Sequence, residues 1–245
     1  MGQVCSRRSG VEAQVCALGF VLLGLLLTRP VSAAQPYTLV ETEDEPGVVV
    51  YPAQAPGARR VTVLLHGMCG EPANACRHFA PRVTIDEHLI CPRASQRCAG
   101  GGSTWPERGS QQLVEAAVQR ALVTLGPDVD ETRGRTLIGY SLGAFRALEL
   151  AERGAGRYPR VMLIGAKISP HLQRLQASGV ERLLLSAGSW DMTHDHMRRE
   201  AGRLSRRGFS AQFLGLGPVG HALTPRFAEY LPQALSWLRA SGGVS

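Results

Sequence analysis

A single serine between two glycines is the first feature of the sequence that could do chemistry. In the segment RTLIGYSLGAFR, Ser141 follows Gly139 by two residues and precedes Gly143 by two. An apolar run comes before this pentapeptide and a helix-like run comes after it. Gly-X-Ser-X-Gly in that context is a nucleophile elbow, in which a strained turn exposes the serine hydroxyl and small neighbours let the backbone come close. The following helix would point its N-terminal N–H groups at the reacting atoms.

A carboxylate and a base follow the serine along the chain, each just past an apolar run. Asp191 comes after RLLLSAGSW, and His221 comes after SAQFLGLGPVG. A serine hydroxyl is a weak nucleophile unless a histidine removes its proton and a carboxylate orients that histidine. Of the seven histidines, only His221 follows the last strand-like run, so we predict Ser141, Asp191 and His221 as the catalytic residues. Asp195 is the alternative acid, although Asp191 is closer to the end of its strand.

Acyl transfer from a serine also needs two N–H donors for the negatively charged oxygen of the tetrahedral intermediate. The sequence HGMCG follows an apolar run upstream of Ser141. We assign the donors to the backbone N–H groups of Met68 and of Leu142, the residue after the nucleophile. His66 and Gly67 are expected to shape the loop that carries Met68.

These residues need a scaffold in which several strands end at one edge of a sheet. From residue 37 onward, strand-like runs alternate with helical runs, a pattern typical of a mostly parallel sheet with helices on both faces. The first two runs are expected to form an antiparallel pair, and 98–109 is expected to be a glycine-rich loop. The predicted strands are 37–41, 47–52, 61–65, 88–92, 136–140, 160–166, 182–188 and 210–216. The predicted helices are 73–83, 111–125, 142–154, 171–179, 193–208 and 226–241.

The motifs HGMCG, GYSLG, GSWD and GH occur in this order, and with them the chain resembles the α/β-hydrolase fold family from about Tyr37 to Ala240. The resemblance implies an α/β fold whose strands run parallel after the first pair, with the triad at their carboxyl ends. Only SPHLQRLQASGVE separates the strand after the elbow helix from the next one, so no large cap domain is expected. The chain is therefore similar to the compact members, which are small esterases, dienelactone-hydrolase-like and cutinase-like enzymes.

The start of the chain has the features of an export signal. Two arginines precede a short apolar core at 15–27, and small residues then allow cleavage after Ala33 or Ala34. The core is shorter than the roughly 20 apolar residues that a membrane span needs. We predict a signal peptide over 1–33, one α/β-hydrolase domain over 34–245, and an exported (periplasmic or secreted) protein without stable membrane insertion after cleavage. An uncleaved N-terminal membrane anchor is the alternative.

Four cysteines remain after this leader, namely Cys69, Cys76, Cys91 and Cys98. An even number in an exported chain suggests two disulfides, for which three connectivities exist. A zinc site is not expected, because six residues separate the members of each pair and no CxxC occurs. The strands that end near Cys69 and Cys91 are neighbours in the family's sheet, so local pairs (69–76, 91–98) and crossed pairs (69–91, 76–98) both fit. Four free thiols are the alternative.

Composition excludes several classes of function. The chain is 44% hydrophobic and 19% charged, which suits a packed domain rather than a disordered chain. Its net charge of +7 comes almost entirely from scattered arginines, with Lys167 as the only lysine, so no nucleic-acid partner is expected. His194 and His196 lie near Asp191, but residues two apart on a helix point away from each other and form a poor chelate. No metal or cofactor is expected, and the oligomeric state stays open.

The sequence therefore predicts an exported serine hydrolase that cleaves a small-molecule ester or a related acyl bond through an acyl-enzyme intermediate. An acyltransferase on the same triad and a non-catalytic binding protein are the alternatives, because a fold does not fix a function. Without a cap, loops at the strand ends must form the acyl site, and the candidates are Met68, Trp105 and Trp190. Trp105 could equally be a core residue. A shallow site of this kind is expected to favour short acyl chains.

Overall fold

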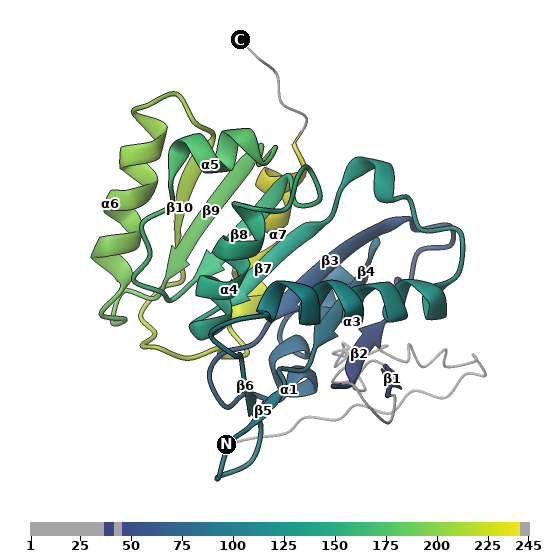
Figure 1. Cartoon of the computed structure of the whole chain (residues 1–245). Helices are drawn as coiled ribbons and strands as arrows, with labels where there is room; N and C mark the ends of the chain where they lie inside the picture. Colours follow the sequence, from purple (N-terminus) through teal and green to yellow (C-terminus); the bar gives the residue numbers. More distant parts are fainter. Residues whose placement is uncertain (1–36, 42–45, 241–245) are drawn as a thin grey trace, which may run out of the picture. The chain divides into compact units, whose positions relative to one another are not determined.

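The computed structural model describes residues 37–41 and 46–240 (Figure 1). The predicted signal peptide, 1–33, lies outside these residues, so the signal peptide and the domain boundary after it stay predictions. Within the described ranges, no helix combines the length and the apolar character that crossing a membrane requires.

An eight-stranded sheet forms the centre of the fold. Its strands are β1 (Thr38–Val40), β2 (Val48–Tyr51), β3 (Arg60–Leu65), β4 (Glu87–Pro92), β7 (Thr136–Tyr140), β8 (Arg160–Ile164), β9 (Arg182–Ala187) and β10 (Ala211–Gly215). Their order across the sheet is β1-β2-β4-β3-β7-β8-β9-β10. β2 pairs antiparallel with β1 and β4, and the pairs from β4 to β10 are all parallel. The predicted opening antiparallel pair and mostly parallel sheet are confirmed.

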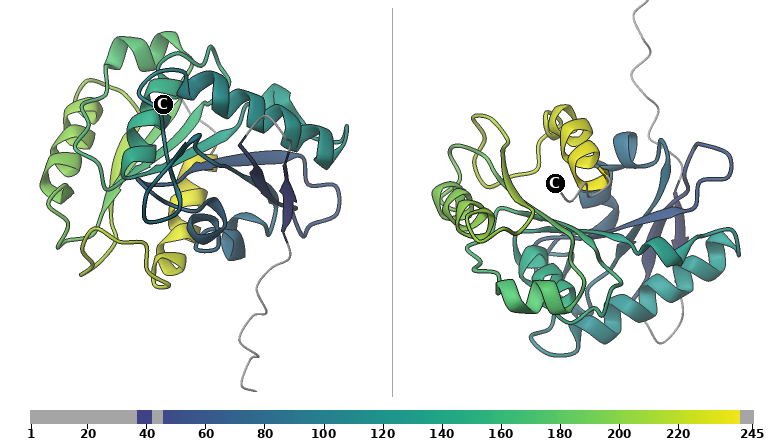
Figure 2. Two further views of the ribbon diagram at one scale, coloured as in Figure 1. Left: turned by 60° about the horizontal axis from the view of Figure 1, so that its bottom comes forward. Right: turned by 90° about the horizontal axis from the view of Figure 1, so that it is seen from above.

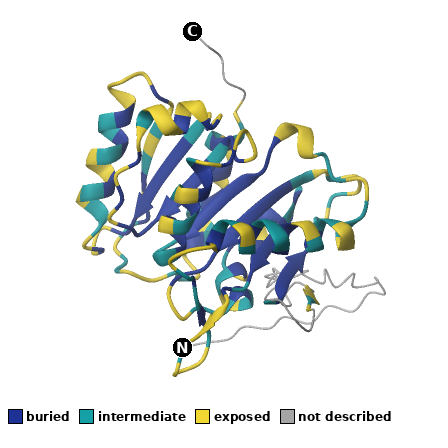
Figure 3. Cartoon of the chain, in the orientation of Figure 1, coloured by how far each residue is buried: buried dark blue, intermediate teal, exposed yellow. Residues whose placement is uncertain are grey.

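Helices cover both faces of this sheet, because its central strands are apolar on both sides (Figures 2 and 3). Val61, Val63 and Leu65 of β3 pack into one hydrophobic cluster, and Leu64 packs into the cluster on the opposite face. The first cluster includes α3 (Ser110–Leu125), α4 (Leu142–Ala151), α5 (Leu172–Ala177) and α6 (His194–Ser205). The second includes α1 (Pro72–Cys76), α2 (Ala80–Val83) and α7 (Phe227–Arg239).

Two segments differ from the predicted elements. The helix predicted over 73–83 is divided into α1 and α2, because Pro81 has no N–H to donate to the preceding turn and lies at the start of α2, where a helix does not need that donor. The loop predicted over 98–109 contains a short strand, β6 (Ser103–Thr104), which pairs antiparallel with β5 (Gln96–Arg97). This β5–β6 hairpin lies next to the HGMCG loop, because Ser103 N–H donates to the carbonyl of Gly70 at 3.1 Å.

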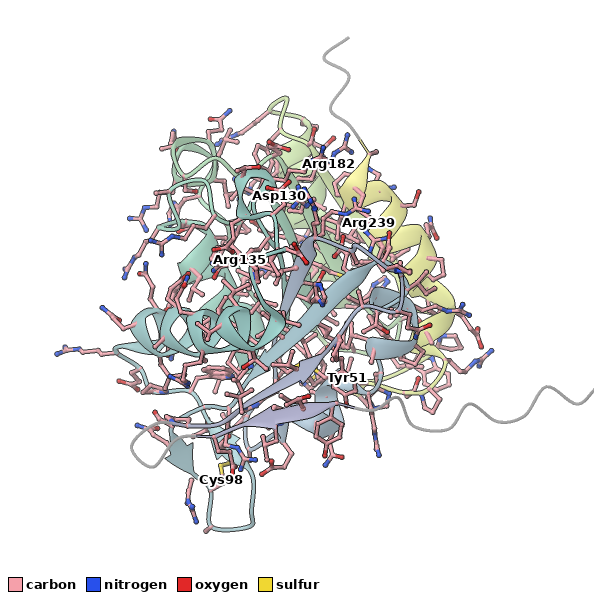
Figure 4. The ribbon with its side chains drawn as sticks, turned by 90° about the vertical axis from the view of Figure 1, so that its right-hand side faces the viewer. Tyr51, Cys98, Asp130, Arg135, Arg182 and Arg239 are labelled. Atoms are coloured by element: carbon pink, nitrogen blue, oxygen red, sulfur yellow. A yellow bond between two sulfur atoms is a disulfide. The ribbon has the colours of Figure 1, made fainter. Side chains whose placement is uncertain are left out.

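The four cysteines form two disulfides, Cys69–Cys98 and Cys76–Cys91, with Cα atoms 5.7 and 6.5 Å apart. This is the third connectivity, and neither the local nor the crossed pairing drawn from the family's sheet is present. α1 packs on β4, which brings Cys76 to Cys91, and the β5–β6 hairpin folds back on the HGMCG loop, which brings Cys98 to Cys69. The sulfur–sulfur bond at Cys98 is visible in Figure 4.

The two disulfides differ in accessibility, which predicts a stepwise reduction. Cys69 is exposed, whereas Cys76 and Cys91 are fully buried. In protein lacking residues 1–33, we expect no free thiol under denaturing conditions without reductant. Mild reductant without denaturant should open only Cys69–Cys98, and turnover should fall before the fold is lost because Cys69 adjoins the predicted oxyanion loop. Loss of both bridges should lower the free energy of unfolding by about 2–4 kcal/mol per bridge.

Alkylation followed by peptide mass spectrometry measures which thiols open at each reductant concentration, and urea unfolding measures the stability. Four thiols in freshly purified, unreduced protein would contradict the two disulfides. Simultaneous opening of both bridges would contradict the stepwise order.

Candidate active site

Ser141 occupies a strained turn between β7 and α4. Its backbone has φ 53° and ψ −119°, a region that residues with a side chain rarely adopt. A Cβ atom on Gly139 would lie 2.5 Å from the carbonyl oxygen of Gly143, and one on Gly143 would collide with the carbonyl oxygen of Leu65. Both glycines are therefore required by the close backbone packing. The N–H of Ser141 donates to the carbonyl of Ile164 on β8 at 2.8 Å, which fixes the turn against the sheet.

The structure brings Ser141, His221 and Asp191 into one chain of hydrogen bonds. Nε2 of His221 lies 2.9 Å from Oγ of Ser141, and Nδ1 of His221 lies 2.8 Å from Oδ2 of Asp191. The three side chains come from segments that follow β7, β10 and β9 respectively. In this arrangement the imidazole can accept the serine proton at Nε2 while it donates from Nδ1 to the carboxylate.

Thr193 holds Asp191 in place, a role that the motifs of the sequence did not indicate. The second carboxylate oxygen of Asp191, Oδ1, accepts hydrogen bonds from the N–H of Thr193 at 2.8 Å and from the Thr193 hydroxyl at 2.9 Å. Burial raises the pKa of Asp191, but the hydrogen bonds from Thr193 and His221 outweigh burial and hold the pKa below its ordinary value. The carboxylate is therefore ionised at neutral pH. An Asp-X-Thr sequence after a strand is the signal that could have indicated this local turn.

The loops that carry Asp191 and His221 are joined by backbone hydrogen bonds. The N–H of Ser189 donates to the carbonyl of Gly217 at 2.8 Å, and the N–H of Trp190 donates to the carbonyl of Val219 at 3.1 Å. These bonds place Asp191 next to His221 without using any side chain of either loop.

Tyr140, immediately before Ser141, stacks on the imidazole of His221. The ring centroids are 5.4 Å apart and the planes differ by 25°. Burial raises the pKa of Tyr140 to about 12, and the nearby charge of Asp191 raises it as well, so the phenol is neutral. The stacked ring restricts the orientation of the imidazole, a role that the spacing of the motif did not indicate.

The HGMCG loop packs directly against Ser141. A Cβ atom on Gly67 would lie 3.3 Å from Cβ of Ser141, so a larger residue would crowd the serine. Within 46–240, the hydrogen bonds between backbone groups outside the regular elements use neither the N–H of Met68 nor that of Leu142. Leu142 is also the first residue of α4, where an N–H has no partner in the helix. Both predicted oxyanion donors are thus free of backbone partners, and their catalytic role stays a prediction.

The alternative acid has other partners. Oδ1 of Asp195 lies 3.2 Å from Nδ1 of His194 and 3.3 Å from Arg198, and this carboxylate is exposed on α6. Nε2 of His196 lies 2.6 Å from the carbonyl of Ile168. Among the residues that the structure describes, no group of three or more His, Cys, Asp and Glu side chains could hold a metal ion.

Trp105 is a core residue and not part of an acyl site. It is 2% exposed, and its indole N–H donates to the carbonyl of His66 at 2.7 Å. The other two candidates do reach solvent, since Met68 is 67% and Trp190 73% exposed. Met192, next to Asp191, is also fully exposed. Three exposed apolar side chains therefore belong to the loops of the proposed oxyanion donor and the proposed acid.

No protein-family model matches the sequence, and none of the curated proteins matches it either. Solved structures do match. FphF, a fluorophosphonate-binding serine hydrolase of Staphylococcus aureus, is 13% identical over 84% of this chain and 98% of its own, with a TM-score of 0.64. The S-formylglutathione hydrolase FrmB of Staphylococcus aureus is 14% identical over 83% of this chain and 98% of its own, with a TM-score of 0.60. Acyl-protein thioesterase 2 of Zea mays is 21% identical over 77% of this chain and 98% of its own, with a TM-score of 0.54.

These similarities, together with the strand order, show that the chain has the α/β-hydrolase fold. The predicted fold class is confirmed. The segment between β8 and β9 comprises only residues 165–181 and contains the short helix α5, as expected for a compact member.

Proposed function

We propose that this protein is a serine hydrolase that cleaves esters or related acyl bonds, with Ser141 as nucleophile, His221 as base and Asp191 as the orienting acid. The observation that carries the proposal is the continuous hydrogen-bonded chain from Asp191 through His221 to Ser141, which begins in a buried carboxylate and ends at a strained elbow. Strained turns of this kind occur preferentially where a side chain must be presented for reaction.

The reaction follows from this geometry. Oγ of Ser141 attacks the acyl carbon while Nε2 of His221 takes the hydroxyl proton, and the carbonyl π electrons move to oxygen. The backbone N–H groups of Met68 and Leu142 stabilise that oxyanion. When the intermediate collapses, the leaving alcohol takes the proton from His221, and an acyl-serine remains. A water molecule then attacks the acyl group while His221 removes its proton. The second intermediate collapses with release of the acid, and Oγ of Ser141 leaves and takes that proton back from His221. Asp191 stays ionised and stabilises the imidazolium.

The matched structures support acyl-bond hydrolysis as the reaction class. Two of them are named for hydrolysis, as a serine hydrolase and an S-formylglutathione hydrolase, and one is a thioesterase. In all three cases the match covers 98% of the other protein's length, so the shared fold is not confined to a part of those proteins.

The two disulfides support export as the location of this activity. Disulfides persist in oxidising compartments and are rare in the cytosol. Cys69–Cys98 and Cys76–Cys91 together use every cysteine of the described residues. The predicted signal peptide and the exported, periplasmic or secreted location are consistent with this pairing.

A fluorophosphonate probe tests the proposal directly. Such a probe forms a bond to an activated serine oxygen with loss of fluoride, so tryptic peptides should show one adduct, on Ser141. Protein carrying His221→Ala should label far more slowly, because the hydroxyl is no longer deprotonated. An unlabelled Ser141 in folded wild-type protein would favour the non-catalytic binding protein. If Ser141 does react with the probe, product analysis with unlabelled protein and an added alcohol distinguishes an acyltransferase, which forms a new ester, from a hydrolase, which forms the acid.

The acyl site predicts a preference for short acyl chains. Met68 and Trp190 are largely exposed, and Trp105 is withdrawn into the core, so the loops can remove only a few methylenes from water. Each methylene that is fully buried contributes about 0.8 kcal/mol, so binding energy should stop rising early along an acyl series. Along a series of p-nitrophenyl esters from acetate to palmitate, we expect kcat/KM to be highest for acyl chains of roughly two to six carbons. The leaving group is constant and serves as the internal control. A steady rise through twelve carbons would contradict this shallow site.

A further inference from the structure

His66 is a fully buried histidine at the start of the HGMCG loop, and its hydrogen bonds define its protonation. Nδ1 lies 2.8 Å from the carbonyl oxygen of Gly67, and Nε2 accepts the backbone N–H of Ala94 at 3.3 Å. Because an amide N–H can only donate, Nε2 carries the lone pair and Nδ1 carries the proton. His66 therefore donates from Nδ1 to the carbonyl of Gly67.

That carbonyl and the N–H of Met68 belong to the same peptide group. In a trans peptide the two groups point in opposite directions, so fixing one fixes the other. The carbonyl of Gly67 accepts a second hydrogen bond, from the N–H of Gly70 at 3.1 Å. Two donors thus hold the oxygen on the His66 side and turn the N–H of Met68 away from it.

We propose that His66 is a positioning residue for catalysis: its Nδ1–H bond to Gly67 orients the Gly67–Met68 peptide so that the Met68 N–H faces the oxyanion formed at Ser141. This inference rests on the proposed function. Gly67 lies against Ser141, where a Cβ atom would be 3.3 Å from that of the serine, so the oriented peptide is adjacent to the reacting atoms.

The surroundings of His66 keep the imidazole neutral and immobile. Burial lowers the pKa of His66 to about 4; the bond to Gly67 opposes this effect, and the charge of Arg93 adds to it. The indole of Trp105 contacts the imidazole at a tilt of 35°, with centroids 4.9 Å apart, and its N–H donates to the carbonyl of His66. Trp105 thus restrains both the imidazole ring and the backbone of His66.

Two substitutions distinguish the hydrogen bond made by Nδ1 of His66 from the one made by Nε2. The amide nitrogen of asparagine is bonded to Cγ, as Nδ1 is, so His66→Asn can still donate to Gly67. The amide of glutamine is one bond further out, near Nε2, so His66→Gln can meet Ala94 but not Gly67. We expect kcat for p-nitrophenyl butyrate to fall by about 100-fold in His66→Gln with nearly unchanged KM, since losing one oxyanion donor costs roughly 100- to 1000-fold. His66→Asn should retain most of kcat.

A trifluoromethyl ketone inhibitor gives a second readout. Ser141 adds to its carbonyl carbon, the proton passes to His221, and the carbonyl oxygen becomes an oxyanion at the two donors. Its affinity should fall in His66→Gln by about the same factor as kcat, because both report oxyanion stabilisation. If His66 had a purely structural role, both variants would have a lower melting temperature, and kcat and inhibitor affinity would not fall together in His66→Gln alone.

Three outcomes overturn the inference. They are wild-type kcat in His66→Gln, equal losses of kcat in both variants, and nuclear magnetic resonance of the wild-type protein showing the proton of His66 on Nε2. The last measurement decides the question even if neither variant folds. Failure of the proposed function is a separate result, since the wild-type enzyme would then show no turnover that depends on Ser141.

Discussion

Replacing Ser141 with alanine is expected to lower kcat/KM for p-nitrophenyl butyrate by about 10⁴- to 10⁶-fold, because triad residues act as a unit and removal of one disables the others. The fold should survive, since the Ser141 hydroxyl does not cap α4 and its hydrogen bond is to the exposed His221. The melting temperature should therefore stay close to that of the wild type. Steady-state kinetics and thermal unfolding measure the two quantities.

Ser205→Ala is the matched control, because Ser205 is an exposed serine at the end of α6. It should keep wild-type activity. His221→Ala should be nearly as severe as Ser141→Ala, because the hydroxyl then has no base. Residual activity in Ser141→Ala above about a hundredth of the wild type would mean that another residue is the nucleophile.

Asp191→Asn is expected to reduce kcat by about 10⁴-fold, as happens when a triad carboxylate becomes an amide and the histidine adopts the wrong tautomer. An asparagine side chain can turn its amide N–H toward Nδ1 of His221, which leaves Nε2 protonated and unable to accept the serine proton. The two hydrogen bonds from Thr193 to Oδ1 should keep the side chain in place, so little stability should be lost. The measurement is kcat across a pH range, with unfolding as the stability control.

Asp195→Asn provides the comparison within the same segment. Asp195 contacts His194 and Arg198 on the surface of α6, so its loss should change kcat very little. Exposed pairs of this kind contribute about 0–1 kcal/mol, which also predicts a small change in stability. If Asp195→Asn were the damaging substitution, Asp195 and not Asp191 would be the orienting acid.

The positions of the chemical groups could be predicted from sequence because each follows a strand. Parallel strands end at one edge, so a serine after β7, an aspartate after β9 and a histidine after β10 must approach each other once the sheet forms. The pattern of apolar runs was enough to define those strands. The same reasoning favoured Asp191 over Asp195 as the acid, because Asp191 lies between the end of β9 and the start of α6, whereas Asp195 lies within α6.

Side-chain partners within the site could not be predicted in this way. The stacking of Tyr140 on His221 and the contact between Gly67 and Ser141 depend on how close neighbouring loops come, which periodicity does not encode. Trp105 shows the same difficulty, because its burial depends on a backbone acceptor at His66, 39 residues earlier.

The disulfide connectivity could not be predicted, because it depends on the β5–β6 hairpin, which the sequence does not indicate. The strand order alone placed Cys69 near Cys91, but α1 lies over β4 and the β5–β6 hairpin returns to the HGMCG loop. A two-residue strand within a glycine-rich segment has almost no sequence signal. The break between α1 and α2, in contrast, could have been read from Pro81.

The backbone bonds between the loops of the acid and the histidine have a consequence for how this protein could evolve. Ser189 and Trp190 hold the loops together through their N–H groups, while the indole of Trp190 is directed to solvent. The identity of these side chains is therefore uncoupled from the geometry of Asp191 and His221. Selection on what the enzyme accepts can change residue 190 freely, through any amino acid with a backbone N–H, and leave the catalytic geometry intact. Proline is the one residue that this position would exclude.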